Sequence, residues 1–496
     1  MNHSNLILCV LAVLVCTAGA EVRQDDPQGR HLVPTNWWES AAAIARVHLG
    51  RQFPLDPDKA APILDDLKTR GISAIEIFAP YHGGRSYGGL DAIDRFNVNP
   101  ELGTMDDFRK LVRLIHSKGM AVISFDNLGY CSSEAPEFLK ACDDVKAGKD
   151  TAEARRFLWA DAANAPPPGP TNDKFFMVRP THLPGYDAVK GEFWEYHARA
   201  GKYFWTKWLG PNLASKVVRL PQYNWGSEEF QQYAERAVRF WMDTGLDGMI
   251  IDAVNWYLGH TWDQDRKRIT DVIRSYGNAY AQPEGAGGFH EDPAAWITEG
   301  GWNSVQDYGL GIWWEKDSHV LRNAIENGDP RPVERALRDY HDRVVASGGV
   351  LYLAGEAHAR FEQPEKQRLA LALEALSGSI FGVNYGRSSG SLQDPEILRL
   401  LELKRVHPAL YNVSTRRLLP TNADDNYYAF LRTSKDGSER LLVVMNFQST
   451  PQTVEVDVSG LAAGTLVELT SGASVDRRNP FPVELPACGY RFYRVQ

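Results

Sequence analysis

The 496-residue sequence predicts an α/β fold built on parallel strands, followed by a separate all-β domain. Up to residue 126, and again from about residue 228, short apolar runs alternate with helical segments. That spacing is typical of βαβ units, which build parallel sheets. From about residue 410 the apolar residues alternate with polar ones instead, as in half-buried strands. Eight strand–helix units would close a barrel, and we expect one here.

The barrel elements come first, and glycines mark the ends of several helices, where the chain readily turns left-handed. We expect strands over residues 42–49, 72–79 and 120–125, separated by helices over 58–70 and 106–118. After an interruption, the expected elements are helices over 228–244, 266–276 and 367–376, and strands over 249–251, 278–284, 350–353 and 379–383.

Residues 127–217 interrupt this order. They contain a proline-rich run over 165–170 and an aromatic cluster, and they are too long for a simple strand–helix loop. Further on, strands are expected over 427–432, 441–447, 453–458 and 489–495, the first two joined as a hairpin. The predicted division is a signal peptide over 1–20, a barrel over 21–126 and 218–405, an inserted subdomain over 127–217, and an all-β domain over 406–496.

Residues 1–20 have the features of a secretory signal, namely an apolar run over 6–15 and small residues at 18–20. No later run is apolar for long enough to span a bilayer, so we expect a soluble protein that is exported to the periplasm or the outside. The net charge of −9 gives no support to nucleic-acid binding. Cys131 and Cys142 could form a disulfide, which would leave Cys488 as a buried thiol, and no spacing resembles a zinc site.

Asp252 is the first candidate for a functional residue. It directly follows the apolar run 249–251, so it would lie at the C-terminal end of a buried parallel strand. In an α/β barrel that edge carries the active site. Burying a carboxylate costs free energy unless it is paired with another group, so an unpaired one at this place indicates a function. The alternative is that Asp252 only caps the next helix.

Residues 98–108 and 245–254, together with the three-part division, resemble the α-amylase family of glycoside hydrolases (glycoside hydrolase family 13). The resemblance implies a (β/α)8 TIM barrel, a B subdomain inserted after the third strand, and a C-terminal β-sandwich. It also implies retaining chemistry on α-linked sugars, which needs a nucleophile and an acid/base about 5–5.5 Å apart. Asp252 matches the nucleophile and Glu284 the acid/base. Glu299 is a poorer candidate, because residues 302–307 resemble the segment that follows the acid/base.

The sequence departs from the family pattern at several places. Ile250 replaces an arginine that holds the nucleophile ionised and oriented. The third family carboxylate is missing from residues 352–361, where Glu356 is close enough to substitute. Tyr130 and Cys131 stand in the places of an asparagine and a histidine. The stacking tyrosine is absent next to Asp91, and Tyr81 or Tyr87 would have to supply that ring.

The resemblance implies a set of further residues that contact substrate. Polar contacts are expected from Asp126, Glu356, His358 and Arg360, and stacking from Trp256, Tyr257 and Tyr81. Trp256 and Tyr257 could instead pack the first turn of a helix. Calcium is a candidate cofactor because family members often use it, although only Asp126 and Asn127 offer nearby oxygens.

Two functions fit these residues. The first is a secreted retaining enzyme that cleaves or transfers α-linked glycosides, with an oligosaccharide or glycoside as its substrate. The alternative is an inactive barrel that binds carbohydrate or recognises a partner protein, as the lost arginine and third carboxylate favour. The retained pair of Asp252 and Glu284 favours the enzyme.

Overall fold

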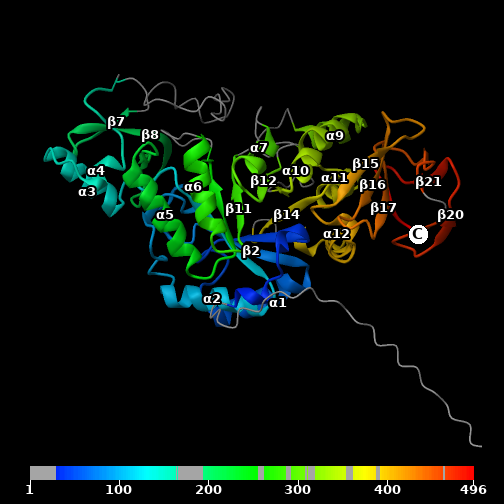
Figure 1. Cartoon of the computed structure of the whole chain (residues 1–496), viewed down its shortest axis with the longest axis horizontal. Coiled ribbons are helices and arrows are strands. Elements are labelled where there is room, and N and C mark those ends of the chain that lie inside the picture. Colours follow the sequence, from blue (N-terminus) through cyan, green and yellow to red (C-terminus); the bar gives the residue numbers. More distant parts are fainter. Residues whose placement is uncertain are drawn as a thin grey trace, which may run out of the picture.

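The computed structural model describes residues 29–163, 165, 194–254, 262–285, 292–307, 310, 319–353, 361–386, 391–461 and 464–496. The predicted signal peptide at 1–20 lies outside these residues. An α/β body fills the centre of the molecule, and antiparallel sheets coloured orange and red lie at one end of its long axis (Figure 1). The segment inserted after the third barrel strand, coloured cyan and green, lies at the other end. Within the described part, no helix has the length and apolar character to cross a membrane.

Eight parallel strands form the central sheet, which confirms the predicted barrel class. Their spatial order is β11-β10-β5-β2-β1-β14-β13-β12. The backbone N–H of Asn303, just before β12, donates to the carbonyl of Ala281 on β11 at 3.1 Å, and this bond joins the two outer strands. The eight strands are β1 (Ala43–Val47), β2 (Ile72–Phe78), β5 (Ala121–Asn127), β10 (Gly248–Asp252), β11 (Tyr280–Pro283), β12 (Ser304–Gln306), β13 (Val350–Leu353) and β14 (Ser379–Asn384).

Helices surround the strands. The predicted helix over 106–118 is α2, which begins at a capping box between Thr104 and Asp107 and buries Phe108, Leu111 and Ile115. The helices around the barrel are α1 (Pro57–Thr69), α2 (Met105–Ser117), α5 (Glu228–Met242), α6 (Trp262–Arg274), α7 (Pro293–Thr298), α8 (Val320–Asn327), α9 (Arg331–Ala336), the π-helix η6 (Leu337–His341), α10 (Asp342–Ala346), α11 (Pro364–Leu376) and α12 (Pro395–Val406).

Strand residues alternate between the barrel interior and the helix layer, and this alternation positions the site. Ile44, Ile123, Ile250 and Ile380 come from four different strands and belong to one buried cluster, which fills the barrel. Their neighbours along the strands, such as Ile251, belong to the larger cluster shared with the helices. Asp252 is two residues beyond Ile250 and therefore continues the inward-facing row.

The described part of the inserted segment is a small antiparallel sheet beside two helices. Its elements are α3 (Pro136–Lys146), α4 (Ala152–Arg155), β6 (Trp159–Ala160), β7 (Trp194–His197), β8 (Lys202–Pro211) and β9 (Val217–Pro221). A short pair, β3 (His82–Gly83) and β4 (Ala92–Asp94), follows β2. The possible disulfide between Cys131 and Cys142 is not formed, since both thiols are free and buried, as is Cys488.

Two antiparallel sheets share a third core at the C-terminal end, and β16 and β17 form the predicted hairpin. The larger sheet contains β15 (Thr415–Leu419), β16 (Tyr427–Thr433), β17 (Arg440–Asn446), β19 (Thr465–Glu468), β20 (Ser474–Asp476) and β22 (Tyr490–Val495). The smaller sheet pairs β18 (Gln452–Val456) with β21 (Phe481–Leu485). Arg432 of β16 joins this domain to the barrel, because its guanidinium donates to the carbonyl of Ser377 behind α11.

Candidate active site

Asp252 and Glu284 come from the C-terminal ends of neighbouring strands, β10 and β11. The two strands pair with Ile251 opposite Pro283. The backbone N–H of Glu284 donates to the carbonyl of Ile251 at 2.7 Å. The Glu284 carboxylate turns back and accepts a hydrogen bond on Oε2 from the N–H of Ala253 at 2.9 Å. The sequence-predicted pair therefore lies together at the edge of the barrel where parallel strands carry active sites.

Ala253 adopts a left-handed backbone, with φ of 47°. A non-glycine residue in this region costs about 1 kcal/mol, and such residues concentrate at functional sites. Here the conformation ends β10 immediately after Asp252 and directs the Ala253 amide to the Glu284 carboxylate. The backbone itself thus sets the position of the second carboxyl relative to the first.

The two carboxyl groups interact electrostatically. Burial raises the pKa of Asp252 well above its usual value, and the negative charge of Glu284 raises it further. Asp126 acts in the same direction, whereas Arg46 on β1 lowers the pKa of Asp252. Two like charges that share one site cannot both ionise freely, which is the condition that separates a nucleophile from a proton donor.

Sequence reasoning missed Arg46 and its partner Glu76 on β2. The two are register partners inside the barrel, with Arg46 Nε and Glu76 Oε1 2.5 Å apart. The hydroxyl of Tyr352 on β13 donates to the other Glu76 oxygen at 2.8 Å. A sequence signal for them exists, because each is the single charged residue of its strand and lies on the inward-facing row.

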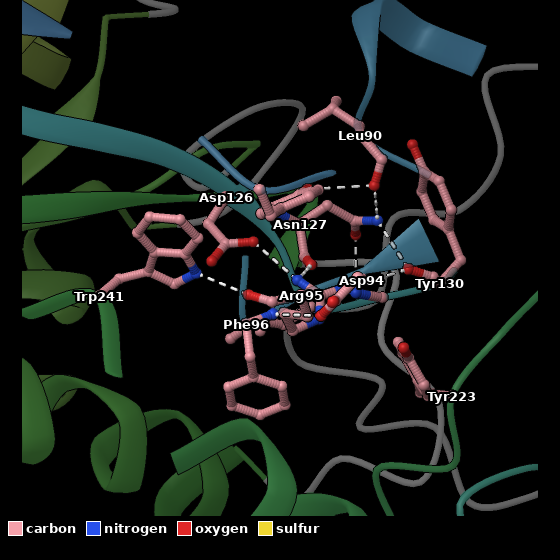
Figure 2. Close-up of polar contacts among 12 residues, drawn as sticks. Leu90, Asp94, Arg95, Phe96, Asp126, Asn127, Tyr130, Tyr223 and Trp241 are labelled. Carbon is pink, nitrogen blue, oxygen red and sulfur yellow. Dashed lines mark hydrogen bonds and ion pairs between the residues drawn. The ribbon is translucent and has the colours of Figure 1, made fainter. Parts of the chain in front are cut away.

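Asp126, expected to contact substrate, is instead enclosed in the wall behind the site. Strand alternation points Phe125 into the barrel and Asp126 to the other side. There Arg95 Nη1 donates to Asp126 Oδ1 at 2.8 Å, and neither side chain has exposed surface. Figure 2 shows this pair beside Trp241, whose indole N–H donates to the backbone carbonyl of Arg95 at 2.9 Å. Asp126 therefore has no exposed surface here, and its charge acts on Asp252.

Calcium does not fit the two oxygen ligands proposed for it. The Asp126 carboxylate already accepts from the Arg95 guanidinium, which fills the cationic position. The side-chain oxygen of Asn127 accepts from the N–H of Gly129 at 2.7 Å, and its amide donates to the carbonyls of Leu90 and Tyr130 (Figure 2). Among the residues that the structure describes, no group of three or more acidic, histidine or cysteine side chains could hold a metal ion.

Tyr87, rather than Tyr81, offers an exposed ring beside the site. Tyr81 is buried, with its hydroxyl on the Leu90 carbonyl and the Arg95 guanidinium 4.9 Å from its ring centroid. Tyr87 is 45% exposed and packs edge-on against Trp208 at 5.8 Å. Burial raises the pKa of Tyr87, and the charge of Asp252 raises it further.

Glu299, the poorer acid/base candidate, falls outside this cluster. Glu299 is exposed at the end of α7 and precedes β12, so it lies at the opposite end of the barrel from the strand ends that carry Asp252 and Glu284. Five predicted contacts lie outside the described residues, namely Trp256, Tyr257, Glu356, His358 and Arg360.

Comparison with known protein families gives two matches. Residues 62–291, which include both acids, match the model of the α-amylase catalytic domain, and residues 416–492 match the maltogenic amylase C-terminal domain. The chain belongs to the α-amylase family. Together the two models cover more than half of this α-amylase family chain and fall on either side of the junction between the barrel and the β domain.

Individual relatives are distant. An oligo-1,6-glucosidase of Parageobacillus thermoglucosidasius is 23% identical over 225 residues, which are 44% of this chain and 35% of that enzyme. A trehalose-6-phosphate hydrolase of Bacillus subtilis is 25% identical over 193 residues, 39% of this chain and 30% of its own length. The matched stretches thus span about a third of these relatives.

Solved structures share the fold over nearly the whole length. Eubacterium rectale Amy13B superposes with a TM-score of 0.71 at 16% identity, over 95% of this chain and 98% of that one. The trehalulose synthase MutB from Pseudomonas mesoacidophila gives 0.64 at 18% identity, over 93% and 99% of the two chains. At this identity the likeness shows the fold alone.

Proposed function

We propose that this protein acts on α-linked glycosides by a retaining mechanism, with Asp252 as nucleophile and Glu284 as general acid/base. The observation that carries the proposal is the hydrogen bond from the Ala253 amide to the Glu284 carboxylate, which brings the two acids to one strand edge. Retaining chemistry requires two carboxyl groups about 5–5.5 Å apart, and this bond holds the Glu284 carboxylate against the residue that follows Asp252.

The mechanism divides the work between the two acids. Asp252, ionised, attacks the anomeric carbon while Glu284 gives its proton to the departing glycosidic oxygen, which leaves a covalent glycosyl–Asp252 ester. Glu284, now ionised, then takes a proton from water or from an acceptor sugar, which displaces Asp252 from the same carbon. Water gives hydrolysis and a sugar gives transfer. The relatives include enzymes named for both outcomes, an oligo-1,6-glucosidase and a trehalulose synthase.

Short α-linked saccharides are the proposed substrates, because the relatives are named for oligo-1,6-glucosides and trehalose 6-phosphate. The exposed ring of Tyr87 supports binding of a sugar face beside Asp252. We further propose that the protein is secreted, on the strength of the apolar run at residues 6–15.

The test is a screen of α-linked disaccharides and oligosaccharides, with the anomer of the first product followed by NMR. The expected product retains the α configuration. Asp252→Asn and Glu284→Gln should each lower kcat by about a thousandfold or more while the protein stays folded. Glu299→Gln is the matched control, since Glu299 is exposed at the far end of the barrel, and it should keep wild-type rates.

An inactive binding protein is the second candidate. The observation that favours it is Ile250, which is fully buried where the family has an arginine. This candidate predicts no turnover of any α-glycoside, and equal binding of saccharides by the wild type, Asp252→Asn and Glu284→Gln in calorimetry. That result would overturn the enzyme proposal.

A further inference from the structure

A charged pair lies within the barrel on the inward-facing row beneath the two acids. Glu76 is fully buried, and both of its oxygens are used, one by Arg46 Nε and the other by the Tyr352 hydroxyl. Arg46 keeps 19% of its side chain exposed. A fully buried carboxylate is stable only with such partners. Glu76 and Tyr352 together therefore fix the direction in which the Arg46 guanidinium points.

The guanidinium lies over aromatic rings at the level of residue 250. Arg46 Cζ is 4.7 Å from the centroid of Phe125 and 5.3 Å from that of Phe78. Both distances are within the range of a cation–π contact. Phe125 is the register partner of Ile250. A cation from the opposite side of the barrel thus reaches the level that the family arginine would occupy.

Arg46 has capacity for a further contact. Glu76 uses only Nε, and the two terminal nitrogens make no hydrogen bond within the part of the chain that the structure describes. Part of the Arg46 side chain is exposed. An arginine fork with two open donors is suited to hold a carboxylate.

We propose that Arg46 is a positioning residue, which supplies from β1 the positive charge that stabilises the ionised form of Asp252 in place of the family arginine. The proposal rests on the proposed function of Asp252 as nucleophile. Ile250 stands where the family has an arginine, and Arg46 would replace that positive charge from a strand on the other side of the barrel.

The charges around Asp252 agree with this role. Burial raises the pKa values of three tyrosines, Tyr81, Tyr87 and Tyr130, and the charge of Asp252 raises them further. After burial, the charges that raise the pKa of Asp252 are Glu284 from β11 and Asp126 from β5. Among the described groups that act on Asp252, Arg46 is the only one that lowers its pKa.

A titration that needs no substrate tests the charge. Aspartate side chains are labelled with ¹³C, and the Asp252 signal is assigned by its loss in Asp252→Asn. In Arg46→Gln the midpoint of Asp252 should rise by about one pH unit, because one nearby cation is removed. Arg46→Lys should leave it near the wild-type value. Arg338→Gln, at an exposed arginine of η6, is the matched control and should not move it.

Removing Arg46 alone leaves Glu76 with one partner, so a second variant protects the test against unfolding. Arg46→Gln/Glu76→Gln replaces the ion pair by two amides that can bond to each other, and it should raise the Asp252 midpoint as the single variant does. Glu76→Gln alone should not raise it. An unchanged Asp252 midpoint in both Arg46 variants overturns the proposal.

Kinetics then separate this proposal from the proposed function. On any α-glycoside that the wild type cleaves, Arg46→Gln should lower kcat more than it changes KM. The midpoint of the acidic limb of the kcat/KM profile should shift to higher pH by as much as the Asp252 titration midpoint does. Arg46→Lys should restore most of the rate. If the titration shifts and no glycoside is cleaved, the proposed function fails while the electrostatic role of Arg46 stands.

Discussion

Arg95 donates from Nη1 to Oδ1 of Asp126 across 2.8 Å, with both side chains fully buried. Arg95 also donates to the backbone carbonyl of Asn127 at 2.6 Å, so one guanidinium holds the end of β5 and the start of the loop that follows (Figure 2). Burial raises the pKa of Asp126 to about 6, while Arg95 opposes that rise. The pair therefore forms part of the wall behind the site.

This relationship predicts a non-additive effect on stability. Arg95→Met leaves Asp126 buried without its cation and should lower the free energy of unfolding by about 3–5 kcal/mol. The double variant Arg95→Met/Asp126→Leu should regain most of that loss, because no uncompensated charge remains. Urea denaturation of the two single variants and the double variant measures the coupling. Additive losses would mean that the pair is not the stabilising unit.

Asp91 predicts a specific pH dependence. Burial raises its pKa to about 7, although Ser86 N–H donates to its Oδ1 at 2.9 Å. Between the unfolded value near 4 and about 7 the folded state binds more protons, so stability falls as pH rises through that window. Asp91→Asn should therefore be more stable than the wild type at pH 8, by about 4 kcal/mol, and equal to it at pH 4. Thermal unfolding at both pH values measures this. An equal difference at the two pH values would contradict it.

The two tyrosines near the acids should respond differently. Tyr87→Ala removes an exposed ring beside Asp252 and should raise KM about tenfold on the α-glycoside identified in the screen, with a smaller change in kcat. Tyr81→Phe removes only the hydroxyl that donates to Leu90 at 3.1 Å, and should cost about 1 kcal/mol of stability at unchanged KM. An unchanged KM in Tyr87→Ala would show that the exposed ring does not contact the substrate.

Arg432 joins the barrel to the C-terminal sheets, and this contact leads to a prediction on stability. Its buried guanidinium donates to the carbonyls of Ser377, Ala409 and Tyr411 at 2.8–3.3 Å. Arg432→Met should lower the free energy of unfolding by about 2–3 kcal/mol, because buried carbonyls lose their donors. Calorimetry measures the shift. Arg417→Met, at an exposed arginine of β15, is the control and should have little effect.

A substitution at Gly378 provides an independent check of the same joint. An added Cβ there would lie 2.8 Å from Arg432 Nη1, and the residue has φ of +107°. Gly378→Ala should therefore displace the guanidinium and destabilise the protein in the same direction as Arg432→Met. A fully stable Gly378→Ala protein would show that the joint tolerates a moved guanidinium.

The barrel could be predicted because its strands and helices are regular. The apolar run 350–353 is reproduced as β13, and the hairpin of β16 and β17 follows the predicted alternation. β12 could not be predicted, because it has only three residues, Ser304 to Gln306, and two of them are polar. Its place in the sheet depends on pairing with β13, which local sequence does not encode.

The pair of acids was predictable and its surroundings were not. Asp252 and Glu284 each follow a recognisable strand. The strand that carries Asp126 was expected to end at residue 125, whereas β5 continues to Asn127. The alternation therefore extends through Asp126 and turns its side chain away from the interior. Arg46 and Glu76 are adjacent only once β1 and β2 pair, which no periodicity within either strand reveals.

The position of Arg46 on β1 separates the cation from the acids along the chain. A fragment that begins after residue 217 would carry both Asp252 and Glu284 and lack the guanidinium, whereas a fragment that ends there would hold the guanidinium alone. Neither fragment would contain both the guanidinium and the two carboxyl groups. Only reassembly of the closed barrel would bring these charges together. In this chain the order of synthesis delivers the cation first, and the acids acquire their counter-charge only when the ring of strands is complete.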